Sequence, residues 1–312
     1  MTEILASGPA VVVPDTELIT SPPASTSARR RPALSPSRAA DFKQCPLLYR
    51  FRAVDRLPET PNRVQVRGTV VHAVLERLLA LAPDRRDPEA GRGLVDPVWR
   101  DVLAGSPELA ELFAGPGDPE LTEWLDSARA LVDAYFALED PRLVVPEACE
   151  LLVEAELPTA RGETLLLRGY IDRLDVAPTG EIRVVDYKSG AAPREVFEAK
   201  ALFQMKFYAL VLFRIRGVVP RQLRLMYLAD RQALSYTPDE AELVRFERTL
   251  AAIWSAILRA AGSGDFRPNP SRMCDWCDHK PRCPAFGGTP PTYPGWPDPA
   301  GAGTETARDR AE

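Results

Sequence analysis

The chain has 312 residues, of which 45% are hydrophobic and 27% are charged. This balance is typical of a water-soluble globular protein and excludes a disordered chain or a membrane protein. No run approaches the roughly 18 apolar residues of a membrane span, and no secretory signal is visible, so we expect a cytoplasmic protein without a membrane partner. The formal net charge of −5 argues weakly against a nucleic-acid partner if the chain is counted as a whole.

Charge is distributed unevenly along the chain. Residues 101–126 contain seven acidic residues and no Lys or Arg, whereas residues 50–67 and 214–231 each contain five arginines and few acids. The two arginine-rich segments could line a phosphate-binding surface. Solvated arginines on helices explain each segment equally well when it is taken alone.

Both ends have the composition of disordered tails. Residues 1–33 are rich in Pro, Ser, Thr and Ala, and residues 288–312 are rich in Gly and Pro, without helical or strand periodicity. We therefore expect one folded domain over residues 34–287, which is long enough to bury a sizeable core.

Helical patterns dominate the first half of this domain. The sequence Ser35-Pro-Ser37 predicts a helix start, followed by a helix over 39–52 that contains Cys45 or ends at it. Apolar residues recur at helical spacing from Val70 to Ala82, which predicts an amphipathic helix. A helical insertion is expected over about 84–140, where helical segments are interrupted by Pro and Gly.

Alternating β-branched residues predict strands from about residue 144 onward. We expect strands at 147–157, 164–177 and 181–187, with a turn at 178–180 that joins the last two into a hairpin. A helix over 195–216, a strand over 222–228 and a helix over 238–261 follow. This order predicts an α/β domain in which helices flank a sheet.

Two of the predicted strands place charged residues on an apolar face. Alternate side chains of a strand share a face. Asp186 and Lys188 continue the face that begins at Ile182, and Asp172 shares parity with Leu174 in the neighbouring strand. The two strands of the hairpin therefore aim carboxylates toward the same face.

Burying these carboxylates requires partners. An unpaired buried carboxylate costs on the order of several kcal/mol, so such acids are normally paired or bound to a metal. One interpretation is a buried ion network of Asp172, Lys188 and Asp186. The other is a divalent-cation site, because two carboxylates offer hard oxygen ligands that suit Mg²⁺ or Mn²⁺. His72 lies at the edge of the 70–82 helix and by itself fits a core histidine.

Four motifs in order resemble a known nuclease family. They are Gly68-Thr-Val-Val-His72, Gly169-Tyr-Ile-Asp172-Arg173, Asp186-Tyr-Lys188-Ser-Gly190 and Gln204-Met-Lys-Phe-Tyr208. In this combination the chain resembles the RecB-like branch of the PD-(D/E)xK nucleases, which includes AddB-type helicase-nuclease subunits and CRISPR-associated iron–sulfur nucleases. The resemblance covers roughly residues 35–286 and implies a restriction-endonuclease-like mixed sheet flanked by helices.

The resemblance also implies roles for individual residues. Three residues would bind the catalytic metal ion: His72, Asp172 and Asp186. Lys188 would activate the attacking water or stabilise the charge that develops on the phosphate. Gln204 and Tyr208 lie one helical turn apart, as in the family's Q-x-x-x-Y motif, and would contact DNA beside the scissile strand. A polar helix edge is the alternative for this pair.

Three of the five cysteines lie close together near the end of the domain. The spacing Cys274-x2-Cys277-x5-Cys283, in a turn-rich segment, is typical of thiolate ligands of a metal. A fourth ligand is required, and the resemblance favours Cys45 over Cys149, which falls in a predicted strand. The resemblance implies a structural [4Fe–4S] cluster on these four cysteines. Zinc, held by the three cysteines with Cys45 or His279, is the alternative.

Together these features predict a divalent-metal-dependent deoxyribonuclease that hydrolyses phosphodiester bonds. The expected substrates are single-stranded DNA or DNA ends, in an exonuclease acting in DNA repair or recombination. No G-x-x-x-x-G-K-[ST] motif is present, so unwinding would require a helicase partner. The alternative is a catalytically silent module that binds DNA or a helicase and is stabilised by an iron–sulfur or zinc site. The isolated charges on an apolar face favour the nuclease.

Overall fold

A computed structural model describes residues 32–115, 117–159, 162, 164–192 and 195–296 of the chain. Pro32–Pro297 form one compact unit, which contains all the elements described below. The predicted tails fall mostly outside the described residues, so their disorder remains a prediction. Contacts of the unit extend past the predicted boundary at residue 287, because the Tyr293 hydroxyl donates to the Ala261 carbonyl at 2.9 Å.

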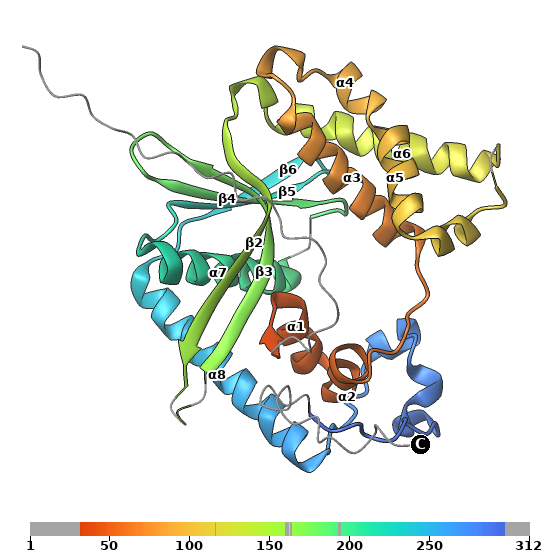
Figure 1. Cartoon of the computed structure of the whole chain (residues 1–312), viewed down its shortest axis with the longest axis vertical. Helices are drawn as coiled ribbons and strands as arrows, with labels where there is room; N and C mark the ends of the chain where they lie inside the picture. Colours follow the sequence, from red (N-terminus) through yellow and green to blue (C-terminus); the bar gives the residue numbers. More distant parts are fainter. Residues whose placement is uncertain (1–31, 116, 160–161, 163, 193–194, 297–312) are drawn as a thin grey trace, which may run out of the picture. The chain divides into compact units, whose positions relative to one another are not determined.

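The described residues contain eight α-helices (Figure 1). Their bounds are α1 (Pro36–Gln44), α2 (Pro46–Tyr49), α3 (Arg63–Ala80), α4 (Pro88–Gly93), α5 (Val95–Gly105), α6 (Pro119–Leu138), α7 (Glu195–Arg216) and α8 (Glu240–Ser263). Helices α4 to α6 occupy the predicted helical insertion. Within the described residues, no helix is both long enough and apolar enough to cross a membrane.

The predicted helix over 39–52 is broken in the structure. Helix α1 begins one residue after Ser35, whose hydroxyl accepts a hydrogen bond from the Arg38 N–H, and it ends at Gln44. Cys45 adopts an extended conformation with φ −160° between α1 and α2. The break follows from Pro46, because proline disfavours helical conformation in the residue before it. Helix α3, in contrast, starts at Arg63, well before the predicted Val70, because Asn62 caps it through the Gln65 N–H.

Six strands of the described residues form one mixed sheet. Their bounds are β1 (Ala33–Leu34), β2 (Pro146–Pro158), β3 (Thr164–Val176), β4 (Ile182–Lys188), β5 (Gln222–Tyr227) and β6 (Gln232–Tyr236). Strands β2, β3 and β4 are antiparallel neighbours, β4 and β5 are parallel, and β5 and β6 are antiparallel. The predicted turn at 178–180 is present, with Gly180 at φ 89°. Strands β1 and β6 were not predicted.

Strand β3 is the centre of this arrangement. It pairs along its length with β2, while β1 pairs with Leu166 and Leu167 and β4 pairs with residues 173–176. Residues 168–172 of β3 therefore lie between the segments that pair with β1 and with β4. This stretch carries Asp172.

Helices cover both faces of the sheet (Figure 1). One core cluster packs α1, α7 and α8 against residues such as Leu174 and Val184, and a second packs α3, α5 and α6 against residues such as Val185 and Tyr187. Strand β4 is thus buried on both faces, since consecutive residues belong to different clusters. Leu174 and Val184 face each other in the β3–β4 ladder and are both fully buried. The predicted apolar face that leads to the carboxylates is therefore present.

Ion pairs within the chain account for most arginines of the two arginine-rich segments. Arg52 pairs with Asp41 at 2.6 Å and with Glu59 at 2.6 Å. Further pairs join these arginines to acids of the described residues: Arg50 to Asp55, Arg63 to Glu120, Arg214 to Glu247, Arg216 to Glu147 and Arg224 to Glu139. A phosphate-binding surface along these segments stays a prediction.

Candidate active site

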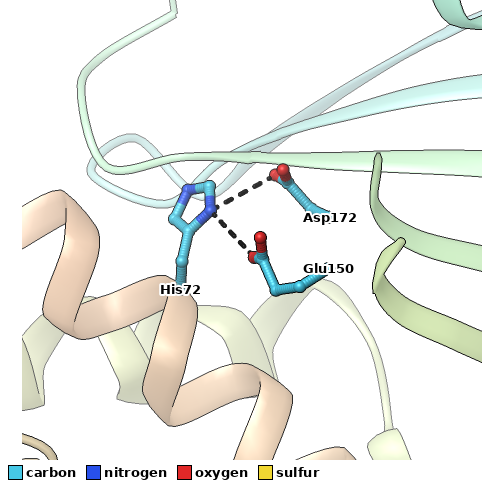
Figure 2. Close-up of side chains that lie close together, drawn as sticks. All are labelled: His72, Glu150 and Asp172. Carbon is cyan, nitrogen blue, oxygen red and sulfur yellow. Dashed lines mark ion pairs between the residues drawn. The ribbon is translucent and has the colours of Figure 1, made fainter. Parts of the chain in front are cut away.

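Three side chains from three elements converge beside the sheet (Figure 2). His72 comes from α3, Glu150 from β2 and Asp172 from β3. The His72 Nδ1 atom lies 3.5 Å from Asp172 Oδ2 and 3.6 Å from Glu150 Oε1. One ligand atom of each residue lies within 4.8 Å of the other two. Among the described residues, this is the only group of three or more His, Cys, Asp or Glu side chains with such spacing.

The backbone of Tyr187 in β4 orients two members of this group. Its N–H donates to Asp172 Oδ2 at 2.7 Å, and its carbonyl oxygen lies 2.9 Å from His72 Nε2. A carbonyl only accepts hydrogen bonds, so Nε2 carries the proton and Nδ1 faces the two carboxylates. Nδ1 needs either a proton or a cation there. The donor set of one imidazole nitrogen and two carboxylate oxygens fits a divalent cation.

Glu150 is the member of the group that sequence reasoning missed. In β2 its neighbours pair regularly, Cys149 with Arg173 and Leu151 with Ile171, so Glu150 lies opposite Asp172. Its φ of 47° is in the left-handed region, which is uncommon for a residue other than glycine. Strained backbone of this kind is characteristic of functional sites. The alternation of β2 places Glu150 on the same face as exposed residues, and only the strand register reveals its partner.

Asp186 lies next to this group but has other contacts. Its Oδ2 is 2.5 Å from Lys188 Nζ, and its Oδ1 accepts a hydrogen bond of 2.8 Å from the Gln204 amide. Gln204 in turn accepts from Lys188 Nζ at 2.9 Å and donates to the Tyr208 hydroxyl at 3.3 Å. Asp186 is 1% exposed and Tyr208 is 5% exposed. The structure thus brings the four predicted residues together as one polar network on the sheet.

This network gives Gln204 and Tyr208 contacts within the protein, and their predicted contact with DNA stays a prediction. Both were expected to contact DNA. Gln204 bridges an acid and a base, and Tyr208 is buried behind it. Gln204 therefore orients Lys188 and Asp186 directly, and Tyr208 orients Gln204.

The site strongly perturbs its titratable groups. Burial raises the pKa of Asp172 to about 7, and the nearby Asp186 adds to this effect. Burial acts to lower the pKa of His72, but Glu150, Asp172 and Asp186 outweigh it and raise the pKa to about 9. The pKa of Lys188 is also raised, because Asp186 outweighs the effect of burial. Lys188 is therefore an ammonium, and the carboxylates crowd together without enough positive charge to balance them.

Close packing around the motif glycines supports the site. A Cβ atom at Gly68 would lie 3.2 Å from the Ser189 hydroxyl, so glycine allows α3 to approach the end of β4. A Cβ atom at Gly169 would lie 2.8 Å from the Tyr208 ring. Both glycines therefore permit a close approach that positions a site residue.

The arginine of the Gly169-Tyr-Ile-Asp172-Arg173 motif has a structural role. Arg173 is fully buried and pairs with Glu139 at 2.7 Å and with Asp175 at 3.0 Å. It also donates to the Tyr187 hydroxyl at 2.8 Å. Arg173 thus holds the hydroxyl group of Tyr187, whose backbone contacts His72 and Asp172. Its pair with Glu139 ties the end of α6 to the sheet.

Four cysteines line one pocket between residues 44–51 and residues 268–286. Cys45, Cys274, Cys277 and Cys283 all line it, and backbone N–H groups of Asn269 and Ser271 donate to the sulfur atoms of Cys45 and Cys274 at 3.4 and 3.3 Å. All five thiols of the chain are free. Cys149 lies apart in β2, where burial raises the pKa of its thiol to about 11. His279 is 1% exposed and its Nε2 lies 3.0 Å from Glu59.

Comparison with known proteins identifies the class. A family model described as the PD-(D/E)XK nuclease superfamily matches residues 33–284. The chain therefore belongs to the PD-(D/E)XK nuclease superfamily. The fold agrees: a solved structure from Eubacterium rectale, described as a candidate exonuclease, superposes with a TM-score of 0.51 at 15% identity and covers 79% of this chain and 87% of its own. At this identity the likeness shows the fold alone, and it confirms the predicted mixed sheet flanked by helices.

Two curated relatives come from mycobacterial phages. The Gene 69 protein of Mycobacterium phage D29 is 27% identical over 281 residues, and that of Mycobacterium phage L5 is 23% identical over 288 residues. Each match covers 82% of this chain and 97% of the phage protein.

Proposed function

We propose that the protein is a divalent-metal-dependent deoxyribonuclease that hydrolyses phosphodiester bonds in single-stranded DNA or at DNA ends. The observation that carries this proposal is the group of His72, Glu150 and Asp172 beside the Lys188–Asp186 pair. A binding module has no need for a buried acid beside a second carboxylate, a setting in which burial and the nearby Asp186 raise the pKa of Asp172 to about 7. Membership of the PD-(D/E)XK nuclease superfamily supports the same activity.

The residues divide into ligands and positioning groups. His72, Glu150 and Asp172 would hold the metal, with Asp186 nearby as a further carboxylate. A bound Mg²⁺ or Mn²⁺ would supply Lewis acidity toward the phosphate and favour ionisation of the attacking water. Lys188, as an ammonium, stabilises the negative charge that develops on the phosphate in the transition state. Gln204 orients the side chains of Lys188 and Asp186 through hydrogen bonds, and the Tyr187 backbone orients those of His72 and Asp172.

A second cofactor is part of the proposal. The resemblance to the RecB-like branch implies a [4Fe–4S] cluster on Cys45, Cys274, Cys277 and Cys283, and the pocket that all four line supports it. No three ligand atoms of this pocket lie within 4.8 Å of one another in the described part of the chain, so the proposal rests on the shared pocket and on the resemblance. The Glu59 contact of His279 argues against it as a zinc ligand.

The biological setting follows from the resemblance alone. DNA repair or recombination, with a helicase as partner, is the setting of the RecB-like branch, and we propose it for this protein. We likewise propose that residues 34–287 form the nuclease domain and that the helical insertion covers about 84–140.

A nuclease assay on end-labelled single- and double-stranded DNA tests the proposed activity. We expect cleavage with Mg²⁺ or Mn²⁺, none with EDTA, and loss of cleavage in Lys188→Ala. Lys206→Ala is the matched control, because Lys206 lies on α7 and pairs with Glu242 on α8 at 2.7 Å. Activity that survives Lys188→Ala would refute the assignment of the site. A wild-type protein that binds DNA without cleaving it would favour the catalytically silent module.

A further inference from the structure

A groove adjoins the candidate active site on the side of Gln204. It lies between the start of α1, strand β3 and helix α7. Gln204 and Tyr208 form its inner wall, so the groove begins where the Lys188–Asp186 network ends. The residues that line its outer part include Arg38, Arg52, Arg168 and Tyr170.

One face of β3 leads from the metal group into this groove. Asp172, Tyr170 and Arg168 alternate along the strand, so their side chains share a face at intervals of about 6.7 Å. Their partners on β2 are also in register: Leu152 lies opposite Tyr170, and Glu154 lies opposite Arg168. Along this face, the candidate metal group with Asp172 is followed by the apolar pair of Tyr170 and Leu152, and then by the ion pair of Arg168 and Glu154.

The apolar pair is unusually exposed for a position beside a buried site. Tyr170 is 54% exposed and Leu152 is 42% exposed, whereas the residues before and after Tyr170 on β3, Gly169 and Ile171, are buried. An exposed aromatic ring with an apolar neighbour offers a flat surface on which a nucleobase can stack. Gly169 keeps this strand close to α7, because any side chain there would meet the Tyr208 ring.

The groove also carries positive charge suited to phosphates. Arg38 is exposed and donates to the Ala33 carbonyl at 2.9 Å, and it forms no ion pair with an acid of the described residues. Arg168 pairs with Glu154, and Arg52 pairs with Asp41 and Glu59, so these acids compensate two of the three arginines. Exposed ion pairs contribute little, which leaves Arg168 able to exchange its partner for a phosphate.

We infer that this groove holds the single strand next to the scissile phosphate, with one base stacked on Tyr170 and flanking phosphates at Arg38 and Arg168. The inference rests on the proposed nuclease function and specifies its substrate. A base paired within a duplex is stacked on both sides and cannot lie on Tyr170, whereas an unpaired base can. Tyr170 is therefore a specificity residue for unpaired DNA, in the groove that Gln204 and Tyr208 also line.

Binding without divalent cations tests this inference separately from cleavage. The affinity of the full chain for a fluorescent 12-nucleotide oligo(dT) is measured by anisotropy in EDTA, for the wild type, Tyr170→Ala and Tyr170→Phe. We expect Tyr170→Ala to weaken binding by about 5- to 150-fold, the range for one base stacked on an aromatic ring. Tyr170→Phe keeps the ring and is expected to bind like the wild type. Binding of a blunt duplex should change less than twofold in either variant.

A second variant tests the phosphate contacts. Arg38→Ala should make the dependence of log affinity on log salt shallower by about 0.7, the change for one phosphate contact of a single strand. Arg142→Ala is the control, because Arg142 pairs with its neighbour Asp140 outside the groove. Equal single-strand affinity of Tyr170→Ala and the wild type, or equal losses for single strand and duplex, would overturn the inference. Failure of the proposed nuclease function would instead appear as absent cleavage by the wild type in Mg²⁺.

Discussion

His72 Nε2 and the Tyr187 carbonyl oxygen lie 2.9 Å apart, although the two residues are 115 positions apart in the sequence. This bond fixes which imidazole nitrogen faces the carboxylates, which would preorganise His72 for the metal that we propose. We expect His72→Ala to lower kcat/KM by more than about 100-fold, the upper end of the effect of losing a supporting contact to a ligand. Calorimetric titration with Mn²⁺ should show a matching loss of affinity. Unchanged Mn²⁺ affinity in a folded variant would remove His72 from the metal site.

Glu150 combines a left-handed backbone with the side chain of a proposed metal ligand, and two substitutions separate these properties. Glu150→Gln and Glu150→Gly both remove the charge, so both should lose most Mn²⁺ affinity and activity. Only glycine relieves the φ of 47°, so Glu150→Gly should be more stable than Glu150→Gln by about 1 kcal/mol. Denaturant unfolding of the two variants measures this difference. Equal stability would show that the left-handed conformation at residue 150 costs nothing.

The pKa values of Asp172 and His72 predict how stability and metal binding depend on pH. Between about pH 4 and 7 the folded protein keeps a proton on Asp172 that the unfolded chain has lost, because burial raises that pKa to about 7. Between pH 6.5 and 9 it keeps one on His72. Each group therefore makes the metal-free protein less stable as the pH rises through its range.

A metal ion must displace both protons, so its affinity rises with pH. We expect the increase in Tm caused by Mn²⁺ to be larger at pH 8.5 than at pH 6.5, measured by thermal denaturation with and without the ion. The His72→Ala variant should lose the part of the metal-free pH dependence above pH 6.5. A Tm increment that is constant from pH 6.5 to 8.5 would contradict a site built from these groups.

The Lys188–Asp186 pair can be tested by a double-mutant cycle. Among the described residues, Lys188→Met leaves the Asp186 carboxylate, which is 1% exposed, with Gln204 as its remaining hydrogen-bond partner. We expect a loss of about 1–3 kcal/mol in the free energy of unfolding. Asp186→Asn with Lys188→Met removes the unpaired charge and should recover most of this loss, while activity stays absent in both. If the losses of the single variants Lys188→Met and Asp186→Asn add up to that of the double variant, the two side chains do not interact.

The cysteine pocket predicts a coloured protein. Anaerobically purified protein should be brown, absorb near 400 nm and contain about four iron atoms per chain. Cys45→Ser should lose most of this absorbance, and Cys149→Ser should keep it, because Cys149 lies apart in β2. A colourless wild-type protein that contains one zinc ion would show that zinc, and not an iron–sulfur cluster, occupies the cysteine pocket.

Local pattern predicted the parts of the site that depend on strand parity. Asp172, Asp186 and Lys188 were found because the alternation of β3 and β4 places them beside buried residues. Glu150 could not be found in this way, since its position depends on the register between β2 and β3 and on a left-handed backbone. The role of Gln204 in the polar network depends on how α7 packs against the sheet, and hydrophobic periodicity does not predict this packing.

The same distinction applies to the fold. The strands that form the buried centre of the sheet were predicted within a few residues, because their apolar residues alternate or run continuously. Strand β6 is short and largely exposed, and β1 has two residues, so neither has a hydrophobic pattern to detect. Pro46 could have predicted the break between α1 and α2, because a proline rarely lies inside a helix.

The pocket lined by Cys45 and by the three late cysteines has a consequence for biosynthesis. Cys45 leaves the ribosome early, whereas Cys283 is among the last residues of the compact unit to be made. A group held by all four sulfur atoms can be inserted only after translation of the unit is nearly complete. The proposed cluster would therefore be inserted late in maturation, between two segments that are also joined by the hydrogen bond from the Asn269 amide to the Gln44 carbonyl oxygen at 2.9 Å.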